Sequence, residues 1–371
     1  MWNNRPRAKA MNIGRPMRSS SFRSQENRAN IIEDKNVAQK SADKLIYPVK
    51  QTRGLGLGGH QKNEERKTSA TVDQSMNSGS AAELLQYNEK AFHHVYHPEI
   101  NGPERELSCV DYSDDVFTYL QAIEKKFSIN EGYLNGKSTT GKMRAILVDW
   151  IVQVHHRLSL LPETLSLAIY VLDAYLTAKD VPKTSLQLTA LTSVFIAAKY
   201  EEMYTPDIRE FEVIGDGQFS KRDILSLEPR MLMVLECCLY RPAHITFLRF
   251  HSSRFCLPEE VHKRAQFFIE ICMQYYQLCH LAPSHMVLIA ISLATAMDGY
   301  EVDMDELLKH SDLKKTQMEN WRAHLAYAIS ANHEHTRLKG ISTKYASSRY
   351  LRSSDLSIEK RQWLEKQFER A

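Results

Sequence analysis

The chain has 371 residues, with 48 Lys and Arg against 45 Asp and Glu, so its formal net charge is +3. At about 100–200 residues per domain, this length allows roughly two domains and a tail. The net charge is too small to indicate nucleic-acid binding by itself. We expect no signal peptide and no membrane span, because no apolar segment lies near the N-terminus and no apolar run reaches about 18 residues.

Cysteine and histidine spacing indicates no metal site and no cofactor. The six cysteines include no CxxC pair and lie at Cys109, Cys237, Cys238, Cys256, Cys272 and Cys279. Five of them fall in apolar or helical segments, which predicts buried, reduced thiols and suits a nuclear or cytoplasmic protein. The histidine pairs lack a second group of ligands, so we interpret them as surface or capping residues. These pairs are His93/His94, His155/His156 and His333/His335.

Residues 1–105 differ in composition from the rest of the chain. Apolar residues are sparse and not periodic, so this segment buries too little surface to offset the entropy of ordering, and we expect disorder. Residues 1–30 contain seven Lys and Arg against Glu26 alone. That excess suits a nuclear-import or anion-binding segment, and equally an ordinary solvated basic tail.

From Asp111 onward, the apolar spacing is helical. A short leading helix carries a stripe of Val116, Leu120 and Ile123. Two sets of five helices follow, and the third helix of each set matches the other in length and small-residue content. The first set is expected at 142–157, at the segment PETLSLAIYVLDAYL that begins with Pro162, and at 183–202, 207–213 and 220–239. The second is expected at 244–250, 261–278, 283–297, 303–310 and 314–331, with a charged terminal helix at 357–370. The predicted fold is therefore all-α, a five-helix domain duplicated in tandem.

Single residues predict where some of these helices begin and bend. Thr139 or Thr140 can cap the helix at 142–157, and Pro162 suits a first helical position because its missing N–H costs nothing there. Pro229 should kink its helix or shift the start of regular pairing. The segment KMRAILVDWIVQVH (142–155) is apolar on every side, which is typical of a buried central helix. Arg144 and Asp149 interrupt it, and buried charges need partners or a function.

The sequence contains no P-loop, no GxSxG, no HExxH and no kinase glycine loop, so we expect a protein that binds other proteins rather than an enzyme. Several separate segments then resemble the mitotic B-type cyclins over roughly residues 110–352. They are MRAILVDW (143–150), PETLSLA (162–168), LQLTAL (186–191), AAKYEEMYTPDI (197–208) and KYASSRYL (344–351). The resemblance implies a tail at 1–105, a first cyclin box with its leading helix at 106–240, a second box at 241–352 and a helical extension at 353–371.

The resemblance also implies a function. The chain is expected to be the non-catalytic subunit of a cyclin-dependent protein kinase, active in G2/M control in nucleus and cytoplasm. In that family the first box packs against the kinase's αC helix and helps to order its activation segment, as phosphoryl transfer requires. Such a subunit acts by binding the active arrangement more tightly. The alternative is a transcription-associated cyclin or a two-cyclin-box transcription factor, although the zinc ribbon of the latter has no counterpart before Cys109.

Two sets of site residues follow from the resemblance. The kinase contact falls on Lys199 and Glu228, together with Tyr200, Glu201 and Glu202. A structural salt bridge between two helices is the competing interpretation. The second repeat has Met297 where Lys199 would be, which assigns kinase contact to the first box. Arg144 and Asp173 resemble the family's internal ion pair.

A docking groove for Arg-x-Leu substrates or inhibitors is also implied, as an exposed apolar slot with a polar rim. Its residues are Met143, Ile146, Trp150, Gln153, Leu186 and Gln187, and the alternative is that they belong to the core. Some cyclins have Glu in place of Gln153, which would attract the peptide's Arg more strongly. The family further implies ubiquitin-mediated destruction, but the tail has only imperfect candidate signals. These are Arg53, Leu55 and Leu57, and Lys62, Asn63 and Glu64.

Overall fold

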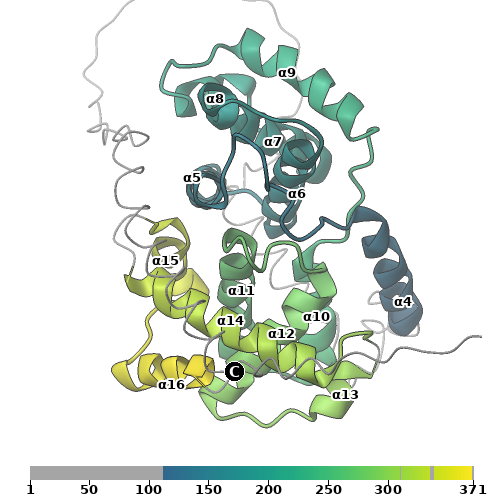
Figure 1. Cartoon of the computed structure of the whole chain (residues 1–371), viewed down its shortest axis with the longest axis vertical. Coiled ribbons are helices and arrows are strands. Elements are labelled where there is room, and N and C mark those ends of the chain that lie inside the picture. The colour runs from purple at the N-terminus through teal and green to yellow at the C-terminus, as the bar shows by residue number, and fades with distance from the viewer. Residues whose placement is uncertain (1–111, 310, 335–337, 370–371) are drawn as a thin grey trace, which may run out of the picture. The chain divides into compact units, whose positions relative to one another are not determined.

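The computed structural model describes residues 112–309, 311–334 and 338–369, all within one compact unit (Figure 1). All the helices predicted from the sequence after residue 111 have a counterpart in these ranges. The described residues contain no strand, as the sequence predicts. The expected disordered tail and the candidate destruction signals in it lie outside the described residues.

The first box consists of five helices. They are α5 (Gly141–Arg157), α6 (Pro162–Ala178), α7 (Leu186–Glu201), α8 (Ile208–Ile214) and α9 (Lys221–Val234). Helix α7 is their centre, because it contacts each of the other four. Its Ala197 and Ala198 are fully buried, and side chains this small allow neighbouring helices to approach closely.

The second box repeats this arrangement around α12. Its helices are α10 (His244–Arg254), α11 (Glu259–Gln274), α12 (Pro283–Asp298), α13 (Met304–Leu308) and α14 (Lys315–Glu334). Helix α12 contacts the other four helices of its box. The predicted duplication of a five-helix domain is confirmed.

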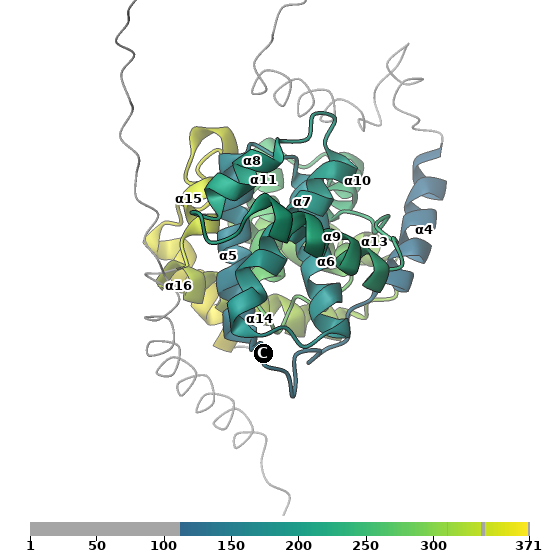
Figure 2. The same cartoon turned by 90° about the horizontal axis from the view of Figure 1, so that it is seen from above.

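Within the described ranges, three further α-helices lie outside the two boxes. The leading helix α4 (Ser113–Glu124) contacts α10 and lies at the edge of the view in Figure 2. Helix α15 (Gly340–Tyr345) packs on α5 and α11, and α16 (Ile358–Glu369) packs on α14. Short 3₁₀ helices occur at η2 (Lys125–Phe127), η3 (Lys183–Ser185) and η4 (Ser348–Tyr350).

Local signals fix several helix starts. The Thr140 side chain accepts the N–H of Met143 at 3.3 Å, and Pro162 occupies the first turn of α6, both as predicted. Helix α9 begins with a capping box between Ser220 and Asp223.

Two helices end earlier than predicted. Helix α9 continues through Pro229 but stops at Val234, not at residue 239, because Glu236 and Cys237 adopt positive φ angles of 52° and 56°. Helix α11 ends at Gln274 rather than at 278. Residues with positive φ, such as Glu236 and Cys237, cannot continue a right-handed helix, whereas α11 ends because Tyr275 is extended, with φ −78° and ψ 118°.

Helix α5 is not buried on all sides, contrary to the prediction from its apolar sequence. It lies at the junction of the two boxes, where it contacts α6, α7, α11 and α15, and Gln153 and His156 remain exposed. The two charges that interrupt it both find partners at this junction. Asp149 Oδ1 accepts the Gly340 N–H at 2.9 Å and Gln274 Nε2 at 3.2 Å. A Cβ at Gly340 would lie 2.6 Å from the Asp149 carbonyl oxygen, so only glycine allows this approach.

The predictions for cysteines and histidines were partly wrong. Cys272 and Cys279 are buried, but Cys237 and Cys256 are exposed and Cys238 is half-buried, because the chain turns outward there after its helices end. All five are free thiols. His155 is buried, and its Nε2 lies 2.9 Å from the Leu161 carbonyl oxygen. Burial and the nearby Lys344 ammonium hold the pKa of His155 well below its ordinary value.

Candidate functional site

Lys199 and Glu228 form an ion pair at the end of α7. Lys199 closes the last turn of α7, Glu228 projects from α9, and the Lys199 Nζ contacts Glu228 Oε1. The Lys199 ammonium also lies 5.0 Å from the centre of the Phe195 ring. The Lys199 side chain is 45% exposed and the Glu228 side chain 10%, so the pair has a sheltered carboxylate and an accessible cation.

Large exposed apolar side chains follow Lys199 in the chain. Tyr200 is 51% exposed, Met203 85% and Tyr204 78%, all within five residues of Lys199. We call these three residues the α7 apolar edge. Exposed apolar surface of this kind marks protein interaction sites. Met203 and Tyr204 were not predicted as site residues, although two apolar residues in a segment that follows a helix end and precedes Pro206 are unusual for a surface loop.

Of the three glutamates predicted to contact a kinase, Glu201 and Glu202 differ from Glu228 and from each other in their surroundings. Glu202 Oε1 accepts the Leu161 N–H at 2.7 Å and the Thr164 hydroxyl at 2.5 Å, so this carboxylate caps the start of α6. In the free chain, the Glu202 carboxylate therefore stabilises the fold of the first box. Burial and the neighbouring Glu163 and Glu202 raise the pKa of Glu201 above its ordinary value.

Arg144 and Asp173 form a fully enclosed ion pair. Arg144 Nε donates to Asp173 Oδ1 at 2.7 Å and Nη2 donates to Oδ2 at 2.6 Å, a bidentate geometry. The Tyr133 hydroxyl donates to the same carboxylate at 2.6 Å, and Arg144 Nη1 donates to the Gln274 carbonyl at 3.1 Å. Because Gln274 belongs to α11, the pair joins the two boxes as well as α5 and α6.

The predicted docking groove is more closed than expected. Met143 is 9% exposed and Leu186 3%, so these two belong to the core instead of lining an open slot. They are buried because α5 and α7 pack directly against each other. Ile146, Trp150 and Gln187 are half-buried, and the exposed Gln153 donates to Asp149 Oδ2 at 2.8 Å. The accessible part of the predicted groove is a strip formed by Ile146, Trp150 and Gln153 of α5 with Gln187 of α7.

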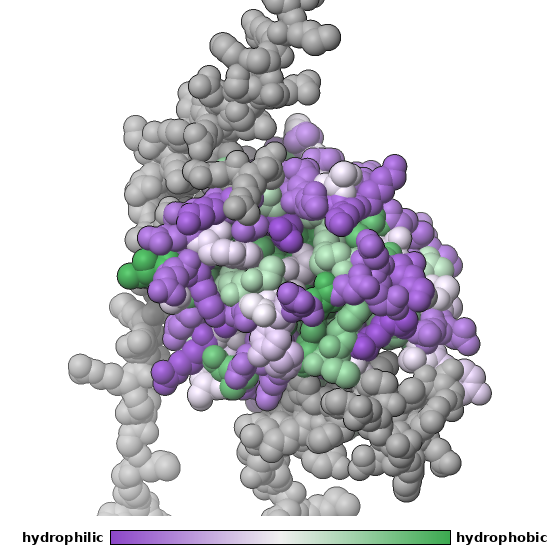
Figure 3. Space-filling model, turned by 90° about the horizontal axis from the view of Figure 1, so that it is seen from below, coloured by the Kyte–Doolittle hydropathy of each residue, from purple (hydrophilic) through white to green (hydrophobic). Residues whose placement is uncertain are grey.

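The described residues contain no group of three His, Cys, Asp or Glu side chains that could hold a metal ion. In the same ranges, no helix combines the length and apolarity needed to cross a membrane. On the face seen in Figure 3, hydrophilic and hydrophobic residues are interspersed, so this view offers no single large apolar surface.

Comparison with known proteins identifies the class to which this arrangement belongs. Residues 115–240 match the family described as "Cyclin, N-terminal domain", and residues 242–359 match "Cyclin, C-terminal domain". The two matches meet in the segment between α9 and α10. They define a protein with two tandem cyclin domains.

Curated relatives narrow this class. The chain is 29% identical over 344 residues to G2/mitotic-specific cyclin-B2 of Gallus gallus, an alignment that covers 88% of this chain and 86% of the relative. It is 30% identical over 318 residues to G2/mitotic-specific cyclin-B1 of Xenopus laevis, covering 85% and 79%. The chain is 33% identical over 263 residues to G2/mitotic-specific cyclin-B of Spisula solidissima, an alignment that covers 71% of this chain and 61% of the relative. The chain belongs to the cyclin family and, within it, to the G2/mitotic-specific B-type cyclins.

Proposed function

We propose that this chain is a regulatory, non-catalytic subunit that binds and activates a mitotic cyclin-dependent protein kinase in G2/M cell-cycle control. The observation that carries the proposal is the accessible Lys199 ammonium, paired with Glu228 and adjoining the α7 apolar edge. A surface that combines exposed aromatic and Met side chains with one fixed charge pair has the composition of a protein interface centre. The names of the B-type relatives favour the mitotic branch over a transcription-associated cyclin.

In this proposal the α7 apolar edge packs on the αC helix of the kinase. The contact holds the αC Glu toward the β3 Lys and supports the ordered activation segment, both of which phosphoryl transfer needs. The cyclin supplies no reacting group. To shift the kinase from 1% to 99% active, it must bind the active arrangement about 5.5 kcal/mol more tightly than the inactive one.

Other parts of the proposed function rest on the family alone. Arg-x-Leu substrates or inhibitors would dock on the strip formed by Ile146, Trp150, Gln153 and Gln187. The ubiquitin-ligase machinery would control the protein's lifetime, and the protein would act in both nucleus and cytoplasm.

The test uses the purified full chain and a mitotic cyclin-dependent kinase catalytic subunit. Wild-type chain should bind in a saturable titration and raise phosphorylation of a histone substrate. Lys199→Glu should abolish both effects, because it places a second carboxylate beside Glu228. Lys183→Glu is the matched control, since Lys183 is exposed in the same box but lies outside the α7 apolar edge. Wild-type binding by Lys199→Glu would reject the proposed interface, and lack of activation by wild-type chain would reject the function.

A further inference from the structure

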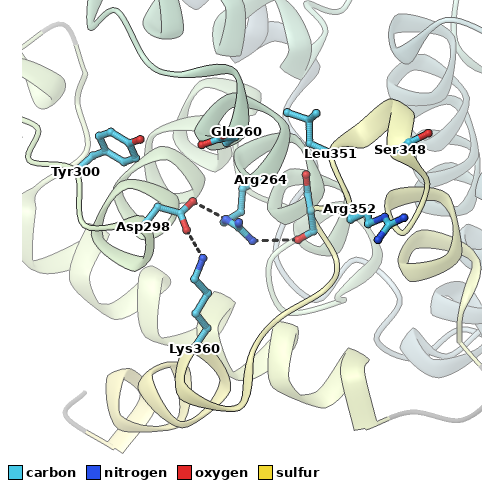
Figure 4. Close-up of a pocket in the computed structure, with 9 residues that line it drawn as sticks. Glu260, Arg264, Asp298, Tyr300, Ser348, Leu351, Arg352 and Lys360 are labelled. Atoms are coloured by element: carbon cyan, nitrogen blue, oxygen red, sulfur yellow. Dashed lines mark hydrogen bonds and ion pairs between the residues drawn. The ribbon is translucent and has the colours of Figure 1, made fainter.

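A polar pocket of about 620 Å³ lies in the second box, away from the residues discussed so far (Figure 4). Four segments form it: the start of α11, the end of α12, the chain around η4, and the start of α16. Its charged lining residues are Glu260, Arg264, Asp298, Arg352 and Lys360, and Tyr300 lies beside them. This volume falls within the range of about 300–1,000 Å³ that is common for ligand sites.

Arg264 is held rigidly within the pocket. Its side chain is 12% exposed, its Nε donates to Asp298 Oδ2 at 2.5 Å, and its Nη1 donates to the Ser353 carbonyl at 3.2 Å. Among the described residues, Nη2 has no hydrogen-bond partner. A guanidinium fixed on two sides with one free donor group is preorganised to bind an acceptor, so little side-chain entropy is lost on binding.

The pocket carries spare positive charge. Lys360 Nζ donates to Asp298 Oδ1 at 2.6 Å, which uses one of the three N–H groups of its ammonium. Asp298 is thus shared by two cations and leaves one positive charge in excess. Arg352 is exposed, has no ion pair within the described ranges and adds a second. Glu260, exposed near the N-terminal end of α11, is the second carboxylate, so three cations against two carboxylates give the lining a formal net charge of +1.

The backbone that presents Arg352 is unusual. Leu351 and Arg352 have positive φ angles of 51° and 52°, which non-glycine residues rarely adopt. Hydrogen bonds from the Arg352 N–H to the Ser347 carbonyl at 3.2 Å and from the Ser353 N–H to the Tyr350 carbonyl at 3.0 Å hold this conformation. Strained backbone of this kind is concentrated at ligand clamps.

We propose that this pocket binds a phosphorylated serine or threonine of a partner protein. A phosphomonoester anion is attracted by this net positive charge, and its oxygens can accept hydrogen bonds from Arg264 Nη2, Lys360 and Arg352 together. Leu351 and Tyr300, which are 45% and 42% exposed, offer apolar surface to the residues that flank the phosphate. Glu260 favours a basic residue among those flanking positions. The inference concerns the second box and does not depend on kinase binding by the first.

The probe is a fluorescein-labelled peptide pool with a fixed central phosphoserine and random flanks, titrated against the full chain by fluorescence anisotropy. The phosphorylated pool should bind at least tenfold more tightly than the same pool with serine. Arg352→Glu and Lys360→Glu should each weaken binding by roughly tenfold or more, since each replaces an attractive charge by a repulsive one. Sequencing of the retained peptides should show Lys and Arg near the phosphoserine, and Glu260→Gln should remove that enrichment.

Arg349→Glu and Lys366→Glu are the matched controls. They reverse exposed charges in the same two segments, do not line the pocket, and should leave the affinity unchanged. The melting curve of Arg352→Glu should stay close to wild type, because Arg352 makes no ion pair within the described ranges, so this variant separates lost binding from lost folding, whereas Lys360→Glu also breaks the pair with Asp298. Equal binding of the two pools would overturn the proposal, as would pocket variants that behave like the controls. Inorganic phosphate that displaces the pool at the same concentration as the phosphopeptide itself would also overturn it, because the site would then be one for a free anion.

Discussion

The ends of α7 and α12 occupy equivalent positions in the two boxes, yet they differ in what covers them. Helix α7 ends in Lys199, which pairs with Glu228 of its own box and stays 45% exposed beside Tyr200. Helix α12 ends in Met297 and Asp298, and the Asp298 side chain is 9% exposed between Arg264 and Lys360. Since Lys360 belongs to α16, the C-terminal extension helps to cover the second end, while the first remains accessible to a partner.

This difference shows how a duplicated domain can assign separate roles to its copies. The helix framework is the same in both boxes, so the change lies in a few side chains at one helix end and in the segment added after the second box. A charge that is neutralised internally stabilises the fold, whereas an accessible charge in an apolar surround is available for binding.

The largest expected effect concerns the junction on which both boxes depend. Arg144→Met should lower the free energy of unfolding by about 3–5 kcal/mol, because it leaves the buried Asp173 carboxylate without its cation. Urea denaturation measures this loss. Arg157→Met, at an exposed position of the same helix, should change stability by less than about 0.5 kcal/mol. A loss below about 1 kcal/mol at Arg144 would contradict the structural role of the pair.

The accessible end of α7 should be sensitive in binding rather than in stability. Lys199→Ala should weaken the kinase complex by roughly 30-fold or more, since an unpaired interfacial charge costs about 2–5 kcal/mol. Glu228→Ala should act similarly, and the double variant should cost less than the sum because the two share one interaction. Met297→Ala, at the equivalent position of the second box, is the control and should bind normally. If Lys199→Ala and Glu228→Ala both bind the kinase as tightly as wild type, the end of α7 is not the kinase contact, and the two helix ends do not differ in this role.

The covered end of α12 should show the opposite pattern. Asp298→Ala should cost about 1–3 kcal/mol of stability, because Arg264 is left largely buried without its acceptor. Kinase binding should not change. Asp355→Ala removes an exposed carboxylate just before α16 and should be close to neutral. Thermal melting and the kinase titration, run on the same samples, separate the two effects, and a selective loss of kinase binding in Asp298→Ala would count against this contrast.

Protonation of the buried His155 at acidic pH should lower the stability of the folded chain. Burial lowers the folded-state pKa of His155 well below its ordinary value of 6.5, so the unfolded chain binds more protons between those two pKa values. Stability should therefore fall as pH drops below 6.5, with His155 contributing up to about 1.4 kcal/mol per pH unit. Denaturation curves between pH 7 and pH 5 should be flatter for His155→Gln than for wild type. The exposed His333→Gln should keep the wild-type slope, and an unchanged slope for His155→Gln would exclude this residue as the cause.

The smallest expected effect lies on α5. Gln153→Glu loses the hydrogen bond to Asp149, and repulsion from that carboxylate turns the new Glu toward solvent, where it should strengthen binding of an Arg-x-Leu peptide by about 2- to 5-fold at low salt, the scale of an exposed ion pair. The gain should disappear at high ionic strength because exposed charges are screened. Peptide titrations at two salt concentrations measure it, with Gln187→Glu as a comparison across the strip. A gain that is independent of salt would point to a change other than the added charge.

Most helices could be predicted from the sequence, because the residues that fix where a helix begins act on backbone groups only a few positions away. Thr140 needs only the N–H of Met143 three residues away, and Pro162 needs only the first turn of its own helix. The early ends of α9 and α11 could not be found in this way. Glu236 and Cys237 adopt positive φ angles, but neither is a glycine, so the sequence does not predict this conformation. Packing of the segment that follows decides where α9 ends.

Lys199 and Glu228 were found through resemblance to the cyclins, whereas the phosphoserine pocket gave no sequence signal. Asp298 lies 34 residues from Arg264 and 62 from Lys360, so no local spacing relates them. For a related reason the sequence did not show that Met143 and Leu186 would be buried. Apolar residues on a helix look alike in the sequence whether a neighbouring helix covers them or not.

The sequence by itself determined the all-α class, the duplication and the placement of most helices, because hydrophobic periodicity and helix caps act within a few residues. Only the tertiary structure decided which apolar side chains stay exposed, which charges are enclosed and which are accessible. Burial and charge pairing depend on groups far apart in the chain, such as Asp149 with Gly340 and Asp298 with Lys360. Their free energies depend on the local surroundings, and those exist only once the helices have packed.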